Sequence, residues 1–302
     1  MVLRKLKSVI KKPKLLLIKS LMFLSPLFSD KIYLKMLFPL KVGYKLNLDN
    51  PKSYNEKLQW LKLNYKNPEL PKLVDKYDYK EYVKKNVGEQ FLIKTYGVWT
   101  SVEEIDFDNL PSQFVLKTTH DQGGVIVCQD KSTFDIVKAK KKLQKHLNRN
   151  LYYLFREWVY NEVQPRIIAE EYLEDKSKEG LKDYKFYCFD GEPKLMYITS
   201  GKQIGANYID FYDMDFNYIN IKRPKFKQMG NHYIKPINWD LMIELAQKLS
   251  KGYPHVRIDF YDVNDKLYFG EFTLFQGGGL MPFYPEKWDY ILGEYINLPE
   301  TK

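Results

Sequence analysis

The stretch VRIDFYDVNDKLYFGEFT, residues 256–273, decides the fold. Its first half alternates apolar residues with Arg257 and Asp259, which is the period of two shown by a half-buried β-strand. A second apolar run, LYFGEFTLF (267–275), follows after a short turn, so the two runs predict an antiparallel hairpin. Because side chains two residues apart share a face, Arg257 and Asp259 point from the same side of the first strand.

The register of this hairpin decides whether Glu271 joins Asp259. A two-residue turn sets Asp259 opposite Gly270, whereas a three-residue turn at 264–266 sets it opposite Glu271. We expect the three-residue turn. Two opposed carboxylates about 5 Å apart need a cation between them, and oxygen ligands favour Mg²⁺ that also contacts phosphates. An isolated Asp and Glu pair on a hairpin is more often two exposed strand residues, so the surrounding motifs decide between these interpretations.

Beyond residue 50, helix and strand patterns alternate without an internal repeat or a long linker. This organisation predicts a mixed architecture of the α+β class. The expected elements are strands at 113–120, 123–130 and 166–173, a hairpin at 184–199 that turns at Asp190 and Gly191, and helices at 133–149 and 239–251.

A lysine and two glycines form a second group of candidate binding residues. Lys117 lies inside the apolar strand FVLKTTH, where a cation needs an anionic partner. Gly123 and Gly124 follow in the next loop, and glycines allow backbone N–H groups to approach phosphate oxygens. A solvent-facing lysine and an ordinary hairpin turn are the plain alternatives. The later strand RIIAEEYLED ends in a charged loop, where exposed backbone groups can contact an adenine edge.

The net charge of +10 lies entirely in the first 45 residues, which hold eleven Lys and Arg and one acid, Asp30. A nucleic-acid-binding protein instead spreads its basic residues over a folded face, so this distribution argues against nucleic acid as a partner. The apolar run LLLIKSLMFLSPLF (15–28) is interrupted by Lys19 and Pro26 and is too short to span a bilayer. Two interpretations remain: a basic amphipathic segment on an anionic membrane surface, or a helical extension packed on the body.

Several longer stretches resemble the TupA-like (teichuronopeptide biosynthesis) branch of the ATP-grasp ligases. They include YNEKLQWLKL, LVDKYDYKEYV, LPSQFVLKTTH, REWVYNEVQPRIIAEEYLED, DYKFYCFDGEPKL and the hairpin stretch itself. The similarity runs from about Tyr54 to Gly293, and the combination is far more specific than any one motif.

The resemblance implies a fold in which two α+β subdomains grip ATP, with Mg²⁺ beside the phosphates. Lys185 and Arg257 would stabilise the charge that develops during phosphoryl transfer. The implied nucleotide-binding residues are Lys76 and Lys117 at the phosphates, Gly123 and Gly124 over them, Glu170, Glu171, Tyr172 and Leu173 at adenine, and Asp183 near the ribose. The implied metal ligands are Asp259, Glu271 and Thr273, although the superfamily usually has Asn at the position of Thr273.

The resemblance also divides the chain and implies an activity. Residues 1–50 are the basic segment described above, and the resemblance implies an ATP-grasp-like domain at 51–295, with a small nucleotide-binding subdomain at 113–175 and a metal-binding subdomain at 180–295. The implied enzyme is an ATP-dependent ligase that forms C–N bonds in capsular or other surface polysaccharide biosynthesis. It would activate a carboxylate, such as that of a uronic acid, and join it to an amino acid or amine. The expected place is the cytoplasm, at the inner face of the membrane.

Two other classes of protein compete with this interpretation. Asp213-Met214-Asp215 matches the D-x-D pattern of glycosyltransferases that use a nucleotide sugar, which is a weak motif in a chain with many acids. The second is a noncatalytic scaffold of a capsule assembly complex. Its support is Thr273 together with Asp121, which stands in the glycine loop where relatives have H-G-S-G.

Overall fold

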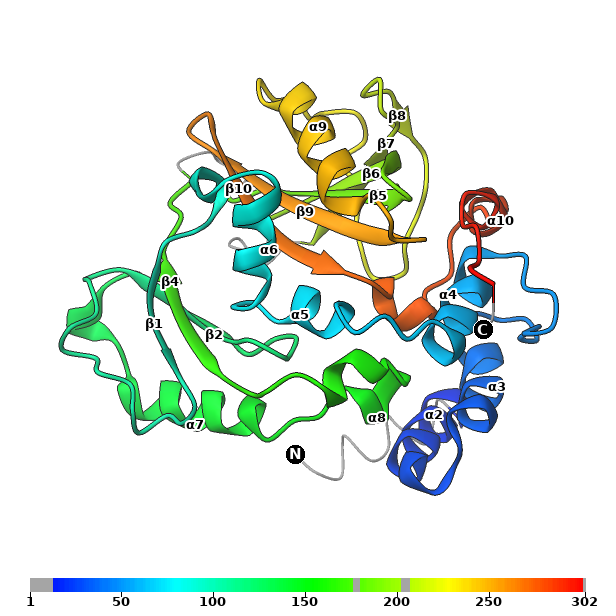
Figure 1. Cartoon of the computed structure of the whole chain (residues 1–302), viewed down its shortest axis with the longest axis horizontal. Helices are drawn as coiled ribbons and strands as arrows, with labels where there is room; N and C mark the ends of the chain where they lie inside the picture. The colour runs from blue at the N-terminus through cyan, green and yellow to red at the C-terminus, as the bar shows by residue number, and fades with distance from the viewer. Residues whose placement is uncertain (1–12, 176–179, 202–206, 301–302) are drawn as a thin grey trace. The chain divides into compact units, whose positions relative to one another are not determined.

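The computed structural model describes residues 13–175, 180–201 and 207–300 (Figure 1). The chain divides into two compact units, each of which is described by itself. The first unit comprises residues 1–66, 150–158 and 275–302, and the second comprises 67–149 and 159–274. All the predicted site residues belong to the second unit.

The second unit contains a small antiparallel sheet with the strand order β1-β4-β2-β3. Its strands are β1 (Thr95–Trp99), β2 (Phe114–Thr118), β3 (Val125–Cys128) and β4 (Ile167–Glu171). The predicted helix is α7 (Ile136–Leu147), which begins after the N-cap Asp135 and buries Leu143 and Leu147 against the strands. A short 3₁₀ turn, η3 (Lys131–Thr133), precedes it.

The second unit also contains a larger antiparallel sheet with the order β10-β9-β5-β6-β7-β8. Its strands are β5 (Asp183–Phe189), β6 (Glu192–Ser200), β7 (Tyr208–Tyr212), β8 (Tyr218–Ile219), β9 (Val256–Val263) and β10 (Lys266–Thr273). The predicted helix α9 (Trp239–Ser250) lies on this sheet, where the rings of Trp239 and Phe186 are 5.4 Å apart. Strands and helices thus confirm the predicted α+β class.

The hairpin of β9 and β10 turns differently from the prediction. Asn264 and Asp265 alone form the turn, both with positive φ, and Val263 pairs with Lys266, so the three-residue turn was wrong. The register shifts at Gly270, however, and this bulge places Glu271 opposite Asp259 as predicted. A Cβ at Gly270 would lie 3.1 Å from the carbonyl oxygen of Asp259, which is why the extra residue is a glycine.

Three short helical segments complete the second unit beside the sheets: α5 (Leu70–Val74), α6 (Tyr79–Asn86) and η2 (Glu89–Phe91). Tyr79 packs edge-on against Phe269 and Phe272 of β10, and its hydroxyl donates to the carbonyl of Gly270 at 3.0 Å. This contact holds α6 to the bulge. A further 3₁₀ segment, η4 (Trp158–Asn161), lies at the junction of the two units in the sequence.

The first unit is helical around one apolar core. Its elements are α2 (Pro13–Phe23), η1 (Ser25–Leu27), α3 (Asp30–Lys41), α4 (Tyr54–Asn64), α8 (Tyr152–Phe155), η6 (Gln276–Gly279) and α10 (Lys287–Glu294). A capping box of Ser53 and Glu56 begins α4. Within the described ranges, every helix is too short or too polar to cross a membrane.

The N-terminal helices pack and expose apolar residues at the same time. Tyr33, Leu34, Leu37 and Phe38 of α3 are buried in the core of the first unit, together with Ile18 and Leu21 of α2. The exposed side of α2 nevertheless carries further leucines. The helical extension therefore packs on its own unit through one side and leaves apolar side chains on the other.

Candidate functional site

An apolar cavity of about 400 Å³ in the second unit is the candidate base-binding slot. It is lined by Ile93, Val115, Lys117, Val125, Val127, Gln129, Tyr172, Leu173, Leu181 and Tyr261. Val125 and Val127 of the edge strand β3 are 39% and 49% exposed, which leaves an open apolar wall. Of the predicted nucleotide-binding residues, Lys117, Tyr172 and Leu173 line this slot.

Glu170 pairs with two lysines beside the slot. Its carboxylate accepts a hydrogen bond from Lys117 Nζ at 2.7 Å and forms an ion pair with Lys80 Nζ at 2.5 Å, and its side chain is only 1% exposed. Burial would raise the pKa of Glu170, but Lys117 and Lys80 outweigh it and hold the pKa below its usual value. Glu170 was predicted to hold adenine, but in the structure its carboxylate pairs with Lys117, which was predicted to contact the phosphates. The anionic partner that Lys117 needs is thus Glu170.

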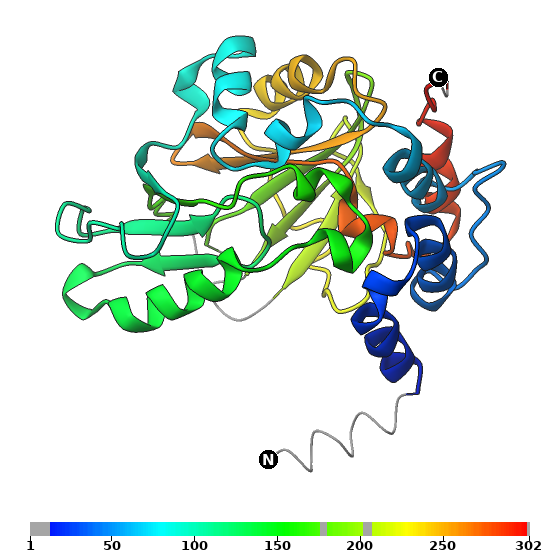
Figure 2. The same cartoon turned by 60° about the horizontal axis from the view of Figure 1, so that its bottom comes forward.

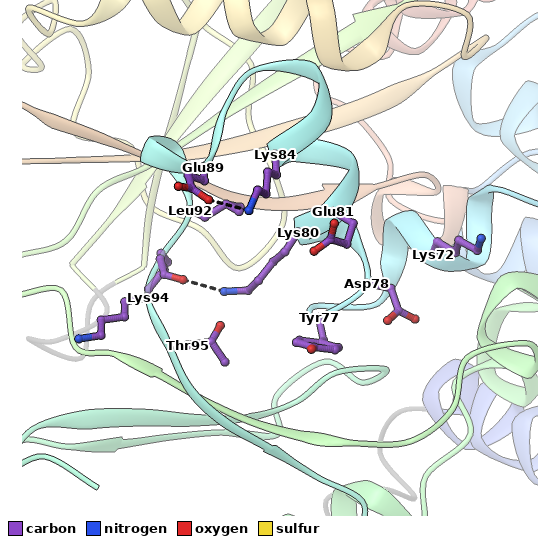
Figure 3. Close-up of a pocket in the computed structure, with 11 residues that line it drawn as sticks. Lys72, Tyr77, Asp78, Lys80, Glu81, Lys84, Glu89, Leu92, Lys94 and Thr95 are labelled. Atoms are coloured by element: carbon purple, nitrogen blue, oxygen red, sulfur yellow. Dashed lines mark hydrogen bonds and ion pairs between the residues drawn. The ribbon is translucent and has the colours of Figure 1, made fainter.

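Lys80 is a site residue that the sequence did not reveal. It comes from α6, and its Nζ also donates to the carbonyl of Ile93 at 2.7 Å. Lys80 also lines a cavity of about 770 Å³, where Lys84 pairs with Glu89 (Figure 3). In the structure, the burial of Lys80, which is 8% exposed, marks it as a site residue. The sequence alone does not distinguish it from Lys84 and Lys85, which lie in the same helix and are exposed.

The other residues predicted at adenine hold the end of β4. The backbone N–H of Glu171 donates to the carbonyl of Lys94 at 3.0 Å, and Gln129 Nε2 donates to the hydroxyl of Tyr172 at 2.8 Å. Leu173 is buried in a small apolar cluster with Ile93. These contacts fix the wall of the slot on the β4 side.

The glycine loop between β2 and β3 is tied down at its acid. Asp121 is buried and pairs with His146 Nδ1 of α7, and its other oxygen lies 3.4 Å from Arg149. Lys76 Nζ donates to the backbone carbonyl of Asp121 at 2.8 Å. The Asp121 carboxylate in the glycine loop is therefore buried and paired with His146 and Arg149 rather than presented to solvent.

The two glycines of this loop have different structural reasons. Gly123 has φ +86°, a conformation that favours glycine, and is exposed. A Cβ at Gly124 would lie 2.0 Å from Thr118 Oγ1 and 3.1 Å from His146 Cβ, so the backbone passes close to β2 and α7. Burial lowers the pKa of Lys76, with Glu271 acting in the opposite direction. Lys76 thus connects the glycine loop electrostatically with β10.

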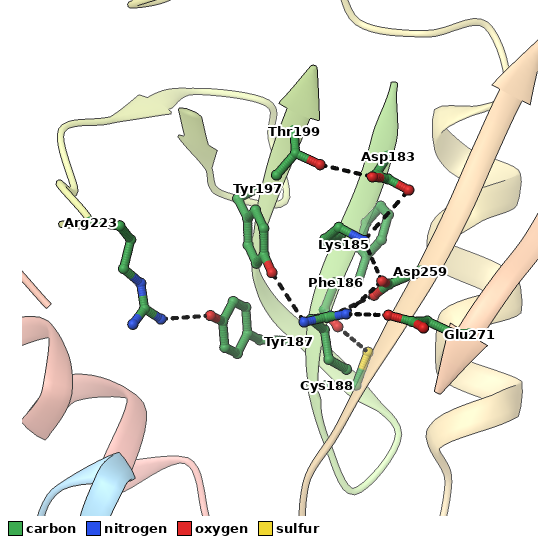
Figure 4. A network of polar contacts seen from close by, with 11 residues as sticks. Asp183, Lys185, Phe186, Tyr187, Cys188, Tyr197, Thr199, Arg223, Asp259 and Glu271 are labelled. Atoms are coloured by element: carbon green, nitrogen blue, oxygen red, sulfur yellow. Dashed lines mark hydrogen bonds and ion pairs between the residues drawn. The ribbon is translucent and has the colours of Figure 1, made fainter. Parts of the chain in front are cut away.

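Arg257, Asp259 and Glu271 form one network on the large sheet (Figure 4). Arg257 donates from Nε to Asp259 Oδ1 and from Nη2 to Asp259 Oδ2, both at 2.6 Å, and from Nη2 to Glu271 Oε1 at 2.9 Å. Asp259 is 1% exposed, whereas the Glu271 side chain is 41% exposed. Arg257 therefore bridges the two acids that were predicted to hold Mg²⁺.

Lys185 and Asp183 of β5 extend this network. Lys185 Nζ pairs with Asp259 and lies 3.6 Å from Asp183 Oδ1, and Thr199 donates to Asp183 Oδ2 at 2.9 Å. Burial would lower the pKa of Lys185, but Asp183 and Asp259 outweigh it and raise the pKa, so the ammonium stays charged. Two buried cations therefore stand beside the partly exposed carboxylate of Glu271.

Tyrosines on the same sheet support the cations. Arg257 Nη1 donates to the hydroxyl of Tyr197 at 3.1 Å, and Arg223 donates to that of Tyr187 at 2.9 Å. The rings of these two tyrosines are 5.7 Å apart. None of the three supporting residues was predicted, because β5 and β6 are rich in aromatic residues and the sequence does not show which hydroxyl meets an arginine.

The slot and the network meet at Tyr261. This residue lines the slot and pairs in register with Asp183 across β9 and β5. Burial and the nearby Asp183 raise the pKa of Tyr261 well above its ordinary value, with Asp183 the larger cause. An apolar slot with Lys117 on its wall thus opens beside a cluster of acids and cations, all within the second unit.

Asp259, Glu271 and Thr273 fit a Mg²⁺ ion only if water and phosphate oxygens supply its remaining ligands. Among the described residues, there is no group of three or more His, Cys, Asp or Glu able to hold a metal ion by themselves. Glu271 offers a partly exposed carboxylate, and Thr273 is half-buried two residues beyond it on the same face. Asp259 lies opposite Glu271, but its oxygens already pair with Arg257 and Lys185, so it would have to share them with a metal ion. This set suits a Mg²⁺ that keeps water and takes further ligands from phosphates.

The D-x-D motif is a turn. Asp213 accepts from the backbone N–H groups of Asp215 and Asn217 at 3.0 and 2.8 Å, and from the Asn217 side chain at 3.0 Å. Both aspartates therefore lie in the connection between β7 and β8, where one of them closes the backbone. The structure gives this motif a local role and brings no second acidic pair to it within the described ranges.

No curated protein matches the sequence of this chain. Among solved structures, it is similar to the D-alanine–D-alanine ligase from Helicobacter pylori, at 14% identity and TM-score 0.42, covering 83% of this chain and 68% of that one. It is also similar to the N5-carboxyaminoimidazole synthase from Aspergillus clavatus, solved with ADP and 5-aminoimidazole ribonucleotide, at 11% identity and TM-score 0.42, covering 82% and 56%.

The family comparison is more extensive than these structural ones. The family model described as TupA-like ATPgrasp matches residues 56–297, which is most of the chain and includes every predicted site residue. The expected ATP-grasp fold is thereby confirmed, and the chain belongs to the TupA-like ATPgrasp family.

Proposed function

We propose that the chain is an ATP-dependent carboxylate-amine ligase. The observation that carries the proposal is the union of two features in the second unit: an apolar slot of about 400 Å³, and the network of Arg257, Asp259, Lys185 and Glu271 beside it. A slot of this size and lining suits a flat base. Arg257 and Lys185 are held in place by Asp259, and such fixed cations suit the transfer of a phosphoryl group, because that reaction depends mainly on positioning and charge.

ATP would lie with adenine in the slot and its phosphates toward the network. Val125 and Val127 would cover one face of the base, with Tyr172 and Leu173 at its edge. The glycine loop and Lys117 would then reach the phosphates. Because Glu170 already holds Lys117, the ammonium is oriented before the nucleotide arrives.

The first chemical step is attack by a substrate carboxylate oxygen on the γ-phosphorus. The bond between this phosphorus and the bridging oxygen breaks, and ADP leaves with that electron pair, so the products are an acyl phosphate and ADP. Arg257 and Lys185 are placed to balance the negative charge on the transferring group. Their acids keep both cations charged and fixed, which avoids reorganisation during the reaction.

In the second step, the amine attacks the acyl carbon. Phosphate leaves, the amine gives up a proton, and an amide is formed. Glu271 is the partly exposed carboxylate of the network and could accept that proton through solvent, whereas Asp259 is enclosed by its two cations. When bound, Mg²⁺ supplies charge neutralisation at the phosphates, and Asp259, Glu271 and Thr273 are the residues that would hold it.

For the substrates we propose a uronic-acid carboxylate and an amino acid or amine, within a capsular or other surface glycan or its precursor. The support is the resemblance of the chain to enzymes of teichuronopeptide biosynthesis. We also propose that the reaction takes place in the cytoplasm, at the inner face of the membrane, because ATP is available there. The glycosyltransferase alternative loses its metal motif, because Asp213 closes a turn.

Thermal-shift titration tests the proposal. A nonhydrolysable ATP analogue should raise the melting temperature only with Mg²⁺, and Glu271→Ala should remove this shift, whereas Glu244→Ala, 55% exposed on α9, should keep it. Hydroxylamine added with ATP and a panel of uronic acids should trap an acyl hydroxamate as ADP forms. Stabilisation by nucleotide sugars and not by the ATP analogue would show that the proposal is wrong.

A further inference from the structure

The N-terminal segment formed by α2, η1 and α3 exposes large apolar side chains. We call this surface the α2–α3 outer face and define it by Leu16, Leu17, Phe23, Leu24, Leu27, Ile32 and Met36. Phe23 and Leu27 are 83% and 75% exposed; Phe23 is the last residue of α2, and Leu27, four residues later, is the last residue of η1. Figure 2 shows this part of the chain in dark blue.

The exposure is not caused by loose folding of the segment. The opposite sides of α2 and α3 are packed in the core of the first unit, where Tyr33, Leu34 and Phe38 are 0% exposed. Arg156 further ties η1 down by donating to the carbonyl of Phe28 at 3.2 Å. A well-anchored segment thus presents an apolar outer side, and such surfaces usually mark a partner.

Basic side chains surround the outer face. Lys14, Lys19, Lys31 and Lys35 are all exposed, and Ile32 and Met36 stand beside the last two at helical spacing. The one acid of the segment, Asp30, accepts from Tyr152 at 2.6 Å and lies 3.3 Å from Arg156 Nε. Its charge is therefore neutralised inside the unit, and the outer face is cationic and apolar without a competing carboxylate.

We propose that the α2–α3 outer face docks on the surface of an anionic lipid bilayer. Phe23, Leu24 and Leu27 would enter the boundary between headgroups and acyl chains, and the lysines would contact the lipid phosphates. A second copy of this chain fits less well, since a twofold interface would bring the same lysines against each other. The proposal does not depend on the catalytic assignment.

Vesicle sedimentation of the full chain tests this proposal. Wild type should bind vesicles of phosphatidylcholine with added phosphatidylglycerol, and should bind phosphatidylcholine alone much more weakly. Phe23→Glu with Leu27→Glu should weaken binding by roughly a hundredfold, because two apolar side chains no longer enter the bilayer. Lys31→Gln and Lys35→Gln should each weaken it about fivefold, and added salt should act in the same direction.

The control is a matched pair on another surface. Ile234→Glu with Ile237→Glu changes two residues that are 88% and 79% exposed in the second unit, with the same change in charge, and should leave binding nearly unchanged. Both double variants should keep the wild-type melting temperature and ATP-analogue binding. Failure of wild type to bind anionic vesicles overturns the proposal. So does equal loss in both variants, or a dimer in light scattering that only Phe23→Glu with Leu27→Glu dissociates.

Discussion

Replacement of Glu170 by glutamine should cost the second unit several kcal/mol of unfolding free energy. The carboxylate is 1% exposed and pairs with Lys117 and Lys80, whose side chains are 17% and 10% exposed, at 2.7 and 2.5 Å. At an effective dielectric constant of about 20, each contact contributes about 6 kcal/mol of attraction before desolvation is subtracted. Loss of one partner from such a buried group typically costs about 3–5 kcal/mol, because the remaining charges stay buried and unpaired.

Urea unfolding provides the measurement, and the same strand provides the control. Glu171→Gln changes the neighbouring residue, which is half-buried and points to the opposite face, and should cost less than about 1 kcal/mol. Combining Glu170→Gln with Lys80→Met should recover part of the loss, because one of the two uncompensated cations is removed. A cost for Glu170→Gln no larger than that for Glu171→Gln would refute the reasoning.

Two further predictions concern stability. Burial lowers the pKa of His255 to about 3, so the unfolded chain binds the proton more readily below pH 6.5; the unfolding free energy should fall by up to about 1.4 kcal/mol per pH unit from 6.5 toward 3, and His255→Gln should remove that slope in urea titrations at several pH values. Gly279→Ala should destabilise by about 2 kcal/mol or more, since the new Cβ would lie 2.4 Å from Gln59 Nε2. Gly43→Ala, at φ +111° but with open space around the new Cβ, should cost only the backbone strain, and a loss for Gly279→Ala no larger than this would show that packing at η6 is unimportant.

Local patterns predicted most of the fold because the relevant signals were periodic. The alternation in β9 and the turn at Asp190 and Gly191 were found in the structure within a residue or two. The hairpin register shows the limit of such reasoning. Asp259 does face Glu271, but the hairpin has a two-residue turn and a bulge at Gly270. Together these two features produce the same pairing at Asp259 that a three-residue turn would have produced.

The candidate site was predictable where one strand carried its chemistry and not where distant segments met. Arg257 and Asp259 share a strand, so spacing alone placed them on one face. The partner of Lys117 is 53 residues away in sequence, and the second lysine on that partner, Lys80, comes from a helix whose other lysines are exposed. Such a contact depends on packing between elements, which periodicity does not encode.

The same limit applies to the glycine loop. Asp121 stands where an acid would oppose phosphate binding, yet its carboxylate pairs with His146 of α7 and with Arg149, two residues beyond the end of that helix. Only the three-dimensional arrangement shows that the loop can tolerate the acid. In the first unit, likewise, the apolar run was recognised, but which of its side chains are buried was set by the packing of α3.

Calorimetric titration with adenylyl imidodiphosphate and Mg²⁺ tests the central claim most directly. Wild type should bind, and Val127→Glu, which places a carboxylate on the open wall of the slot, should weaken binding at least tenfold. Val137→Glu makes the same change at a valine that is 80% exposed on α7 and outside the slot, and should bind as wild type does. Equal affinities for wild type and Val127→Glu, or no binding by wild type, would contradict the assignment of the slot to ATP.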